Sequence, residues 1–556
     1  MPTSQGWGAA AMRRFGGFLQ AVLVAAALLW SGSAAAGQLV LRNQSFAPVS
    51  CTVDGWTVAT GFQFDWVVTV QPNQTFQVGQ NTTRPGGSVI NWARCGQLST
   101  RAMNITPTSP DGILIFNGQQ TRVLNAALYP FLPTLPGDQF ETLVTHVVET
   151  YQQQNPQVLL AAQMNPETDI YSFTELPQLL GQNGLDVIEL DTLYMAFLAN
   201  GHYINTAQIA GEQPLAVATA ASTVANQLWG IPSWLCMDFV YSGNAGVQQA
   251  TTLANLLAFL GTMPQTAPEM VGDYNGSWRL PSIYINAYVQ LHGYGAIGQA
   301  MNPNIPPDPA TITNLVNLTD TCAYASANNC TNGTYHNSPN GTPEQTFATG
   351  HAGADMGFSE QSFFVNLYGP VTPLYAVPAA WGQTPQPLLF SDSFVTSAAT
   401  CTNGSACGAD AAAFTTLMTA LPMKNYIVKS QDLPQGTPWR TLLVAQTSFY
   451  GQAAIQANPM YAQYWPVIRP GAQPAPQPFP NAFTAQLQTQ LGTSVCQALK
   501  AQQPQYVCNS GQAAARTPAA ATPRRSKARP GRERAKPAPK PARPAPVPVP
   551  VPVESR

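Results

Sequence analysis

The stretch Asp186-Val-Ile-Glu-Leu-Asp191 decides the fold class, because it is a short apolar run that ends in a carboxylate. Such a run is typical of a buried strand. Strand-like runs also lie at residues 123–128 and 158–162, and residues 140–154 between them have the apolar spacing of an amphipathic helix. Strands that alternate with helices predict an α/β sheet, which binds ligands at the carboxyl ends of its strands.

This alternation extends over residues 121–510, about 390 residues, which predicts two lobes because one ordinary domain has roughly 100–200 residues. Residues 37–120 instead hold short alternating runs broken by Gly, Pro and Asn, which predict a small β module. We see no site chemistry in that module. Residues 321–345, rich in Asn, Thr and Gly, are expected to form a surface insertion.

Both ends of the chain differ from the body. Arg13 and Arg14 precede an apolar run at residues 15–30, and a small-residue A-x-A site follows it. This order predicts a signal peptide at residues 1–36 and a secreted or periplasmic protein, because the run is shorter than the roughly 20 residues of a membrane anchor. Residues 511–556 consist mainly of Ala, Pro, Arg and Lys and predict a disordered basic tail.

The charge distribution disfavours nucleic acid as a partner. Charged residues make up only 9 % of the chain. From Ser510 onward there are eleven Lys or Arg against two Asp or Glu, a balance of +9, and the leader adds +2 from Arg13 and Arg14. With a net charge of −2 for the whole chain, the body between them carries −13. An acidic body repels phosphates and favours a cationic or neutral ligand. The tail either adsorbs to an anionic envelope surface or is a solvated spacer.

Nine cysteines in an exported chain predict disulfides. Pairing by proximity joins Cys51 to Cys95, Cys322 to Cys330, Cys401 to Cys407 and Cys496 to Cys508, although spacing alone does not fix connectivity. Cys236 is left over, as either a reactive thiol or an inert buried cysteine. The five histidines and the cysteines show no paired metal spacing, so we expect neither a metal nor a cofactor.

The residues around Cys236 form a recognisable motif. Trp229-Gly-Ile-Pro-Ser-Trp-Leu-Cys236-Met-Asp-Phe-Val-Tyr241 holds a Gly-x-Pro-x-x-x-Cys segment that leads into a strand with Tyr at its end. This segment resembles the one found in the thiaminase I (thiamine pyridinylase) family. Four more blocks occur in the family's order: Ala127-Leu-Tyr-Pro-Phe-Leu-Pro133, the run from Asp186 to Gly201, Met356-Gly-Phe-Ser-Glu360-Gln-Ser362 and Leu389-Phe-Ser-Asp392-Ser393. The resemblance covers about residues 123–470 and leaves out the β module and the tail.

The resemblance implies a two-lobed fold like that of class II periplasmic solute-binding proteins, and a transferase that acts on thiamine. It implies that Cys236 is the nucleophile that adds to the pyrimidine and that Glu360 is its base. Asp191 and Asp392 correspond to carboxylates that face the pyrimidine. The cleft's aromatic positions correspond to Tyr129, Tyr171 and Tyr335, whereas Phe131, Phe358 and Phe390 replace Tyr, which keeps stacking and loses phenolic hydrogen bonds.

These residue types suit that chemistry. A thiol with a pKa of about 8.5 is mostly protonated at neutral pH, and a buried carboxylate with a pKa near ~7 can take its proton. The thiazolium is a cation, which aromatic faces and carboxylates attract. A second nucleophile, a pyridine-like base or a thiol, then replaces the thiazole.

Other interpretations stay open. Taken singly, Glu360 can be a surface residue in a loop, and Asp191 and Asp392 can cap helices. The cleft can bind thiamine or another solute without turning it over, with Cys236 as a buried bystander. A third alternative is an envelope protein that attaches through the β module and the tail.

Overall fold

The computed structural model describes residues 37–508, except residues 79–87, 102, 108, 110, 139, 166–169, 277 and 370. The described residues belong to one compact unit. The predicted signal peptide at residues 1–36 and the predicted tail at residues 511–556 lie outside them. Within the described part of the chain, no helix has both the length and the apolar character that a membrane span requires.

The largest sheet has ten strands and forms the first lobe. Its strand order is β21-β13-β20-β10-β8-β9-β7-β1-β4, and β22 pairs with β20. The bounds are β21 Leu443–Val444, β13 Ile231–Cys236, β20 Leu388–Thr396, β10 Val187–Asp191, β8 Arg122–Ala127, β9 Val158–Gln163, β7 Gly112–Phe116, β1 Leu39–Asn43, β4 Thr75–Val78 and β22 Gln477–Pro478. The predicted strands correspond to β8, β9 and β10, and β8 pairs in parallel with both of the others.

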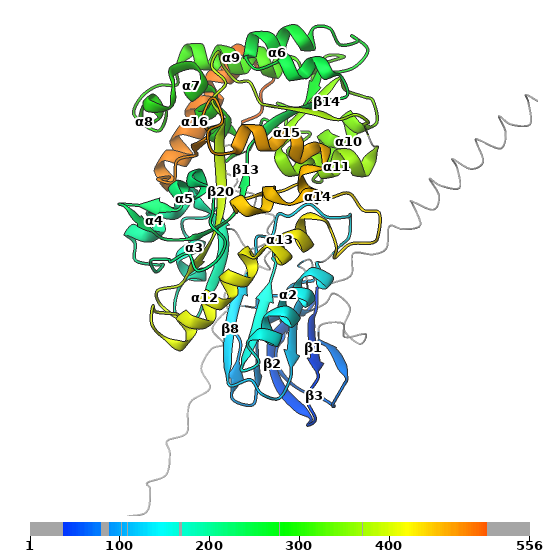
Figure 1. Ribbon diagram of the computed structural model, residues 1–556, viewed down its shortest axis with the longest axis vertical. Coiled ribbons are helices and arrows are strands. Elements are labelled where there is room, and N and C mark those ends of the chain that lie inside the picture. The colour runs from blue at the N-terminus through cyan, green and yellow to red at the C-terminus, as the bar shows by residue number, and fades with distance from the viewer. Residues whose placement is uncertain are drawn as a thin grey trace, which may run out of the picture. The chain divides into compact units, whose positions relative to one another are not determined.

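The second lobe holds a four-stranded sheet of order β15-β18-β14-β19. Its strands are β15 Met270–Val271, β18 Ala354–Phe358, β14 Asp238–Ser242 and β19 Tyr375–Pro378. The chain passes from the first sheet to the second between β13 and β14, with only Met237 between them. It returns from β19 to β20. These two connected α/β lobes are the predicted fold class, and Figure 1 shows β14 with its helices at the top and β8 with α2 at the bottom.

Helices cover both sheets. Beside the large sheet lie α2 (Glu141–Gln154), the predicted amphipathic helix, with α5 (Ala216–Ala221) and α12 (Ala406–Thr419). In the second lobe α7 (Arg279–His292) packs against α9 (Pro309–Asp320) and α16 (Ala485–Gln502). The start of α9 follows local rules: the Asp308 side chain accepts a hydrogen bond from the Thr311 N–H, and Pro309 occupies the first turn. The remaining helices are α3 Glu175–Leu179, α4 Met195–Asn200, α6 Leu253–Leu260, α8 Ile297–Ala300, α10 Thr342–Ala348, α11 Ser362–Tyr368, α13 Leu421–Val428, α14 Ala453–Gln456 and α15 Pro459–Ile468.

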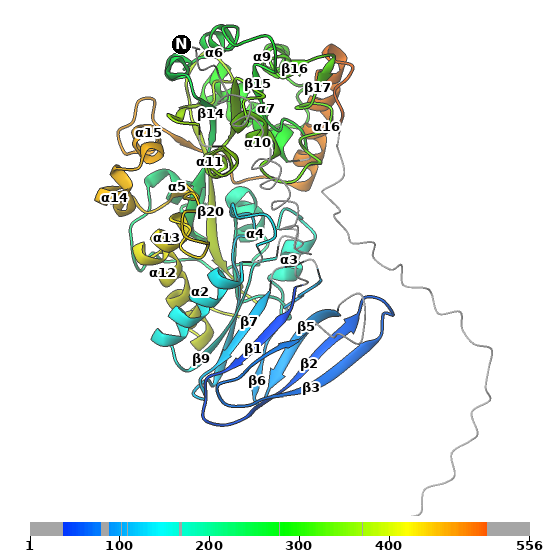
Figure 2. The ribbon, with the colours of Figure 1, turned by 90° about the vertical axis from the view of Figure 1, so that its right-hand side faces the viewer.

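The described elements between residues 37 and 120 are all strands, but they belong to two sheets. Four of them, β2 (Val49–Thr57), β3 (Gln63–Val70), β5 (Ser88–Cys95) and β6 (Leu98–Ser99), form a sheet of order β3-β2-β5-β6. The other three, β1, β4 and β7, extend the large sheet, and Figure 2 shows β1 and β7 next to β9. Alternating runs predict strands but do not determine which sheet each strand joins. The domain boundaries at residues 120 and 510 stay predictions.

The predicted surface insertion at residues 321–345 is on the surface only in part. Its first half is an exposed turn between β16 (Ala323–Tyr324) and β17 (Ala327–Asn328). Its second half turns inward: Tyr335 is 7 % exposed and Glu344 is 1 % exposed. A composition rich in Asn, Thr and Gly predicts irregular backbone. Such backbone can line a cavity as well as lie on the surface.

The predicted cysteine pairing is confirmed. Disulfides join Cys51 to Cys95, Cys322 to Cys330, Cys401 to Cys407 and Cys496 to Cys508. All nine cysteines lie in described residues, and Cys236 is the free one.

Candidate active site

Four of the predicted site residues share one face of the large sheet. Asp191 is the last residue of β10, and Cys236 is the last residue of β13. The strand between them, β20, places Asp392 directly opposite Asp191 and Phe390 directly opposite Cys236. Because side chains two residues apart on a strand point to the same face, these four side chains form one surface.

Glu360 reaches this surface from the second lobe. It lies in the short turn η4 (Ser359–Gln361) directly after β18. The Ser359 backbone N–H donates to the Met237 carbonyl oxygen at 3.0 Å, which ties this turn to the residue that follows Cys236. The rings of Phe358 and Phe390 meet edge to face, with centroids 5.7 Å apart. Glu360 and Cys236 therefore come from different sheets, at the place where the chain crosses between them.

A cavity of about 260 Å³ lies here. Seven of the eight predicted site residues line it: Tyr129, Tyr171, Asp191, Cys236, Tyr335, Glu360 and Phe390. The eighth, Asp392, is 5 % exposed and lies in the sheet beside Asp191. The hydroxyls of Tyr129 and Tyr171 are hydrogen-bonded at 3.2 Å. The fold brings these side chains together, and the role of each stays a prediction.

Burial shifts the pKa values of Cys236 and Glu360. It raises the pKa of the Cys236 thiol well above its usual value, and the negative charges of Glu360, Asp392 and Asp191 raise it further. Burial also raises the pKa of Glu360 to about 7, although Ser359 Oγ donates to its carboxylate at 3.0 Å. At neutral pH Cys236 is therefore a thiol, and an appreciable fraction of Glu360 is a carboxylate that can accept its proton.

The two aspartates have raised pKa values for the same reason. Burial raises the pKa of Asp191 to about 7, although its side chain accepts a hydrogen bond from the Leu193 N–H at 3.0 Å. The pKa of Asp392 is raised well above its usual value by burial and then by the charge of Asp191. Asp191 thus both caps a turn and lines the cavity, while burial and the neighbouring carboxylate favour the protonated form of Asp392.

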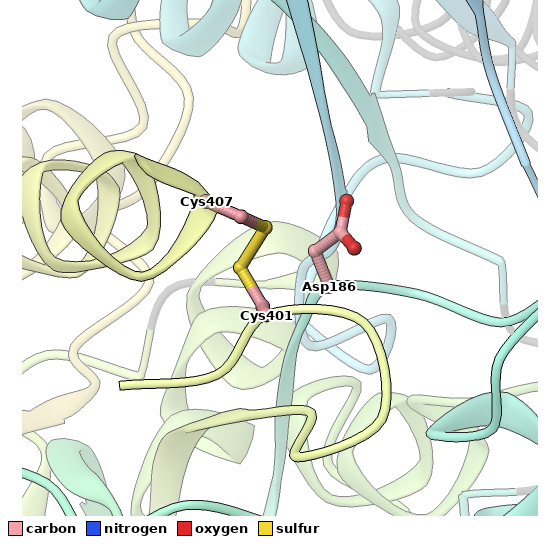
Figure 3. Close-up of side chains that lie close together, drawn as sticks. All are labelled: Asp186, Cys401 and Cys407. Carbon is pink, nitrogen blue, oxygen red and sulfur yellow. A yellow bond between two sulfur atoms is a disulfide. The ribbon is translucent and has the colours of Figure 1, made fainter. Parts of the chain in front are cut away.

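One cluster with metal-ligand spacing occurs elsewhere in the described residues, and it consists of Asp186, Cys401 and Cys407. Figure 3 shows the two sulfurs bonded to each other beside the carboxylate. Disulfide sulfurs are not thiolates and do not ligate a metal in that form. Asp186 Oδ2 instead accepts hydrogen bonds from Asn125, from its backbone N–H and its side-chain amide, both at 2.8 Å. This cluster is therefore a disulfide next to a hydrogen-bonded carboxylate and not a metal site.

Comparison with known proteins places the fold. No family model and no curated protein matches the sequence. Among solved structures, thiaminase I from Bacillus thiaminolyticus aligns with a TM-score of 0.52 and 19 % identity, over 68 % of this chain and 99 % of that one. Clostridium botulinum thiaminase I in complex with thiamin aligns with a TM-score of 0.53 and 16 % identity, over 68 % and 99 %. The chain has a thiaminase I-like fold.

The same fold occurs in solute-binding proteins. Maltose-bound T. maritima MalE3 aligns with a TM-score of 0.51 and 13 % identity, over 69 % of this chain and 96 % of that one. The predicted class II periplasmic-binding-protein-like architecture is therefore confirmed.

In this thiaminase I-like fold, a buried network that sequence analysis missed lies beneath the cavity. Lys424 Nζ donates to Ser233 Oγ at 2.6 Å, and Ser233 Oγ donates to Glu189, whose carboxylate accepts the Tyr129 N–H at 3.0 Å. Lys424 Nζ also lies 3.4 Å from the ring centroid of Trp234. Burial lowers the pKa of Lys424 to about 7, against the opposing charges of Glu189 and Asp392. One feature of the sequence indicated this network: Glu189 lies inside the apolar run that ends at Asp191. A charged side chain in a buried strand needs a partner.

A second group that sequence analysis missed is Arg279, whose partner Asp238 lies two residues after Cys236. Arg279 Nη2 is 2.6 Å from Asp238 Oδ1, and its guanidinium lies 4.5 Å from the ring centroid of Phe358. Asp273, Trp278, His336 and Glu344 also line the cavity. Asp238 stood in the quoted block around Cys236, where an acid in an apolar strand signals a buried partner.

Proposed function

We propose that the protein is a secreted thiamine-degrading transferase that replaces the thiazole of thiamine with a second base through a Cys236–pyrimidine adduct. One observation carries the proposal: the only free thiol among the nine cysteines shares a cavity with a carboxyl whose pKa burial raises to about 7. The substrate class is supported by the C. botulinum thiaminase I of the same fold, which was solved in complex with thiamin.

The first step forms the adduct. Glu360 takes the thiol proton, and Cys236 Sγ bonds to a pyrimidine carbon, so an electron pair of the ring moves onto a ring nitrogen. A protonated Asp392 is suited to donate a hydrogen bond to that nitrogen and to stabilise the charge that develops there. Asp191, directly opposite on β10, belongs to the same acidic pair.

The second step exchanges the leaving group. The bond between the methylene carbon and the thiazolium nitrogen breaks, its electron pair stays on that nitrogen, and neutral thiazole departs. The incoming base bonds to the methylene carbon, the ring expels the Cys236 thiolate, and Glu360 returns the proton. The aromatic side chains of Tyr129, Tyr171, Tyr335 and Phe390 offer faces for the pyrimidine and for the cationic thiazolium.

A second candidate function is non-catalytic binding of thiamine or another solute in the cell envelope. The similarity to MalE3 favours it, because that protein of the same fold was solved with maltose bound. In this case Cys236 is a buried bystander. Both candidates fit a secreted or periplasmic location, which the four disulfides support. The basic tail is then free to adsorb to an anionic envelope surface.

One experiment separates the two candidates. The purified protein is incubated with thiamine and pyridine, and mass spectrometry looks for the product in which pyridine replaces thiazole, while calorimetry measures thiamine binding. Formation of the exchanged product supports the transferase. Binding without any product supports the solute-binding protein.

A further inference from the structure

We infer that His336, oriented by Asp273, is the general base that takes the proton of an incoming nucleophile that carries an N–H. The inference rests on the proposed function and adds to it a further catalytic residue. The activation of the Cys236 thiol belongs to Glu360 and is separate from this role.

The pair lies in the same cavity as the nucleophile. Asp273 and His336 line it together with Cys236 and Glu360. Their side chains are 33 % and 27 % exposed, whereas Asp191 is 6 % exposed and Asp392 is 5 % exposed. The deep acids are therefore suited to a bound ring, and the more accessible pair is suited to a second molecule that arrives from solvent.

The geometry of the pair is that of an oriented base. His336 Nδ1 lies 3.1 Å from Asp273 Oδ2, and Asp273 Oδ1 accepts the Asn275 N–H at 2.9 Å. A carboxylate at Nδ1 holds the neutral imidazole as the Nδ1–H tautomer, which makes Nε2 the atom that takes up a proton. The same division of roles between a histidine and an aspartate operates in hydrolytic triads.

The surrounding backbone fixes this pair relative to the nucleophile. Gly276 has φ +104°, and a Cβ there would lie 2.6 Å from His336 Cε1, so the backbone packs directly on the imidazole ring. Arg279 Nε donates to the Asp273 carbonyl oxygen at 3.1 Å, and Arg279 Nη2 is 2.6 Å from Asp238. Asp238 is two residues after Cys236, so a short chain of polar contacts connects the pair to the strand of the nucleophile.

The proton balance distinguishes two kinds of nucleophile. When aniline bonds to the methylene carbon, its nitrogen loses one proton to His336 Nε2, and the ring expels the Cys236 thiolate. That proton then leaves to solvent, and the product is neutral. Pyridine has no N–H, so its product keeps the positive charge and no proton is transferred to a base. His336 therefore accepts a proton when aniline reacts and accepts none when pyridine reacts.

The test compares these two nucleophiles. Exchange of thiazole is measured with the full chain at limiting aniline or limiting pyridine. We expect His336→Asn to lower kcat/KM for aniline by roughly 10²-fold or more, within the range of general-base catalysis, and to lower kcat/KM for pyridine far less, because pyridine gives up no proton. The asparagine amide can still donate to Asp273 but cannot accept a proton. Asp273→Asn is expected to show the same selectivity with a smaller loss.

Three results bear on the inference. An equal loss with both nucleophiles, or no loss with either, overturns it, because a structural role does not depend on the N–H of the nucleophile. His351→Asn, at an exposed histidine bonded to Thr349, is the matched control and is expected to change neither rate. Absence of pyridine exchange in the unmodified protein is a different result, which removes the proposed function and the inference with it.

Discussion

Asp191 and Asp392 lie directly opposite each other on antiparallel strands, and both are almost completely buried, at 6 % and 5 % exposure. Two adjacent buried carboxyls do not both ionise at neutral pH, because each charge opposes the other and burial opposes both. The raised pKa values of both groups follow from this arrangement. The pair therefore provides a proton donor where the proposed adduct develops charge.

The protonated state of Asp392 is tested by two substitutions. Asp392→Asn keeps a neutral hydrogen-bond donor of the same shape, so we expect turnover to fall by less than about tenfold. Asp392→Ala removes the donor and is expected to cost roughly 10²–10³-fold in kcat, as the loss of an oxyanion donor does. Thiazole release is the measurement. If Asp392→Asn is as inactive as Asp392→Ala, the reaction needs a carboxylate or a full proton transfer at this position.

Glu360 is expected to control the pH dependence of activity. Its pKa is raised to about 7, so kcat/KM for thiamine should rise with pH and level off above about pH 7 as the carboxylate forms. Glu360→Gln should lose this limb and roughly 10²–10⁴-fold of activity. Its residual activity should still increase at higher pH, because bulk base then produces thiolate. A pH profile of Glu360→Gln that matches the unmodified protein contradicts the assignment.

The same substitution should change stability in the opposite direction. Folding raises the pKa of Glu360 from 4.5 to about 7, so the folded state binds the extra proton and loses stability as pH rises through that window. Glu360→Gln removes this loss. Thermal unfolding should show equal midpoints for the two proteins below about pH 4.5 and a higher midpoint for Glu360→Gln above about pH 7. Equal midpoints at both pH values speak against a buried, neutralised Glu360.

Cys236 should be the one residue that reacts with an alkylating reagent in the unfolded, unreduced protein. The other eight cysteines are paired, so iodoacetamide in denaturant without reductant is expected to label a single peptide. Peptide mapping by mass spectrometry is the measurement. Labelling of Cys322 or Cys401 under these conditions would overturn the pairing.

The C-terminal tail should be dispensable for turnover. A chain that ends at Ser510 loses a net charge of +9, from eleven Lys or Arg against two Asp or Glu, and none of the proposed site residues. We expect unchanged thiamine exchange and weaker binding to anionic vesicles, an effect that added salt should remove because it screens charge. Truncation that abolishes exchange shows instead that the tail contributes to the folded body.

Much of the fold was predictable because its signals are local. The apolar runs at β8, β9 and β10 and the periodicity of α2 are properties of a few consecutive residues. The membership of β1 and β7 in the large sheet was not predictable, since strand pairing is decided by contacts between distant segments. The same limit explains residues 335–344, whose polar composition does not reveal that most of them line the cavity.

The candidate site was predictable where a motif carried it. Cys236, Glu360 and Asp191 stood in blocks that resemble thiaminase I, and the structure gathers them in one cavity. Lys424 and Glu189 are far apart in the sequence and meet only through Ser233 in the folded chain. From the sequence, Lys424 in the apolar helix α13 is expected to be exposed to solvent, whereas the structure buries it.

The central claim is that Cys236 performs the exchange, and Cys236→Ser tests it most directly. The measurement is the yield of the pyridine-exchanged product from thiamine, together with calorimetric binding of thiamine to the same protein. We predict exchange by the unmodified protein, loss of nearly all exchange in Cys236→Ser, and thiamine binding by both, because the aromatic and acidic side chains remain. Exchange by Cys236→Ser at the unmodified rate, or no exchange by the unmodified protein, would contradict the account.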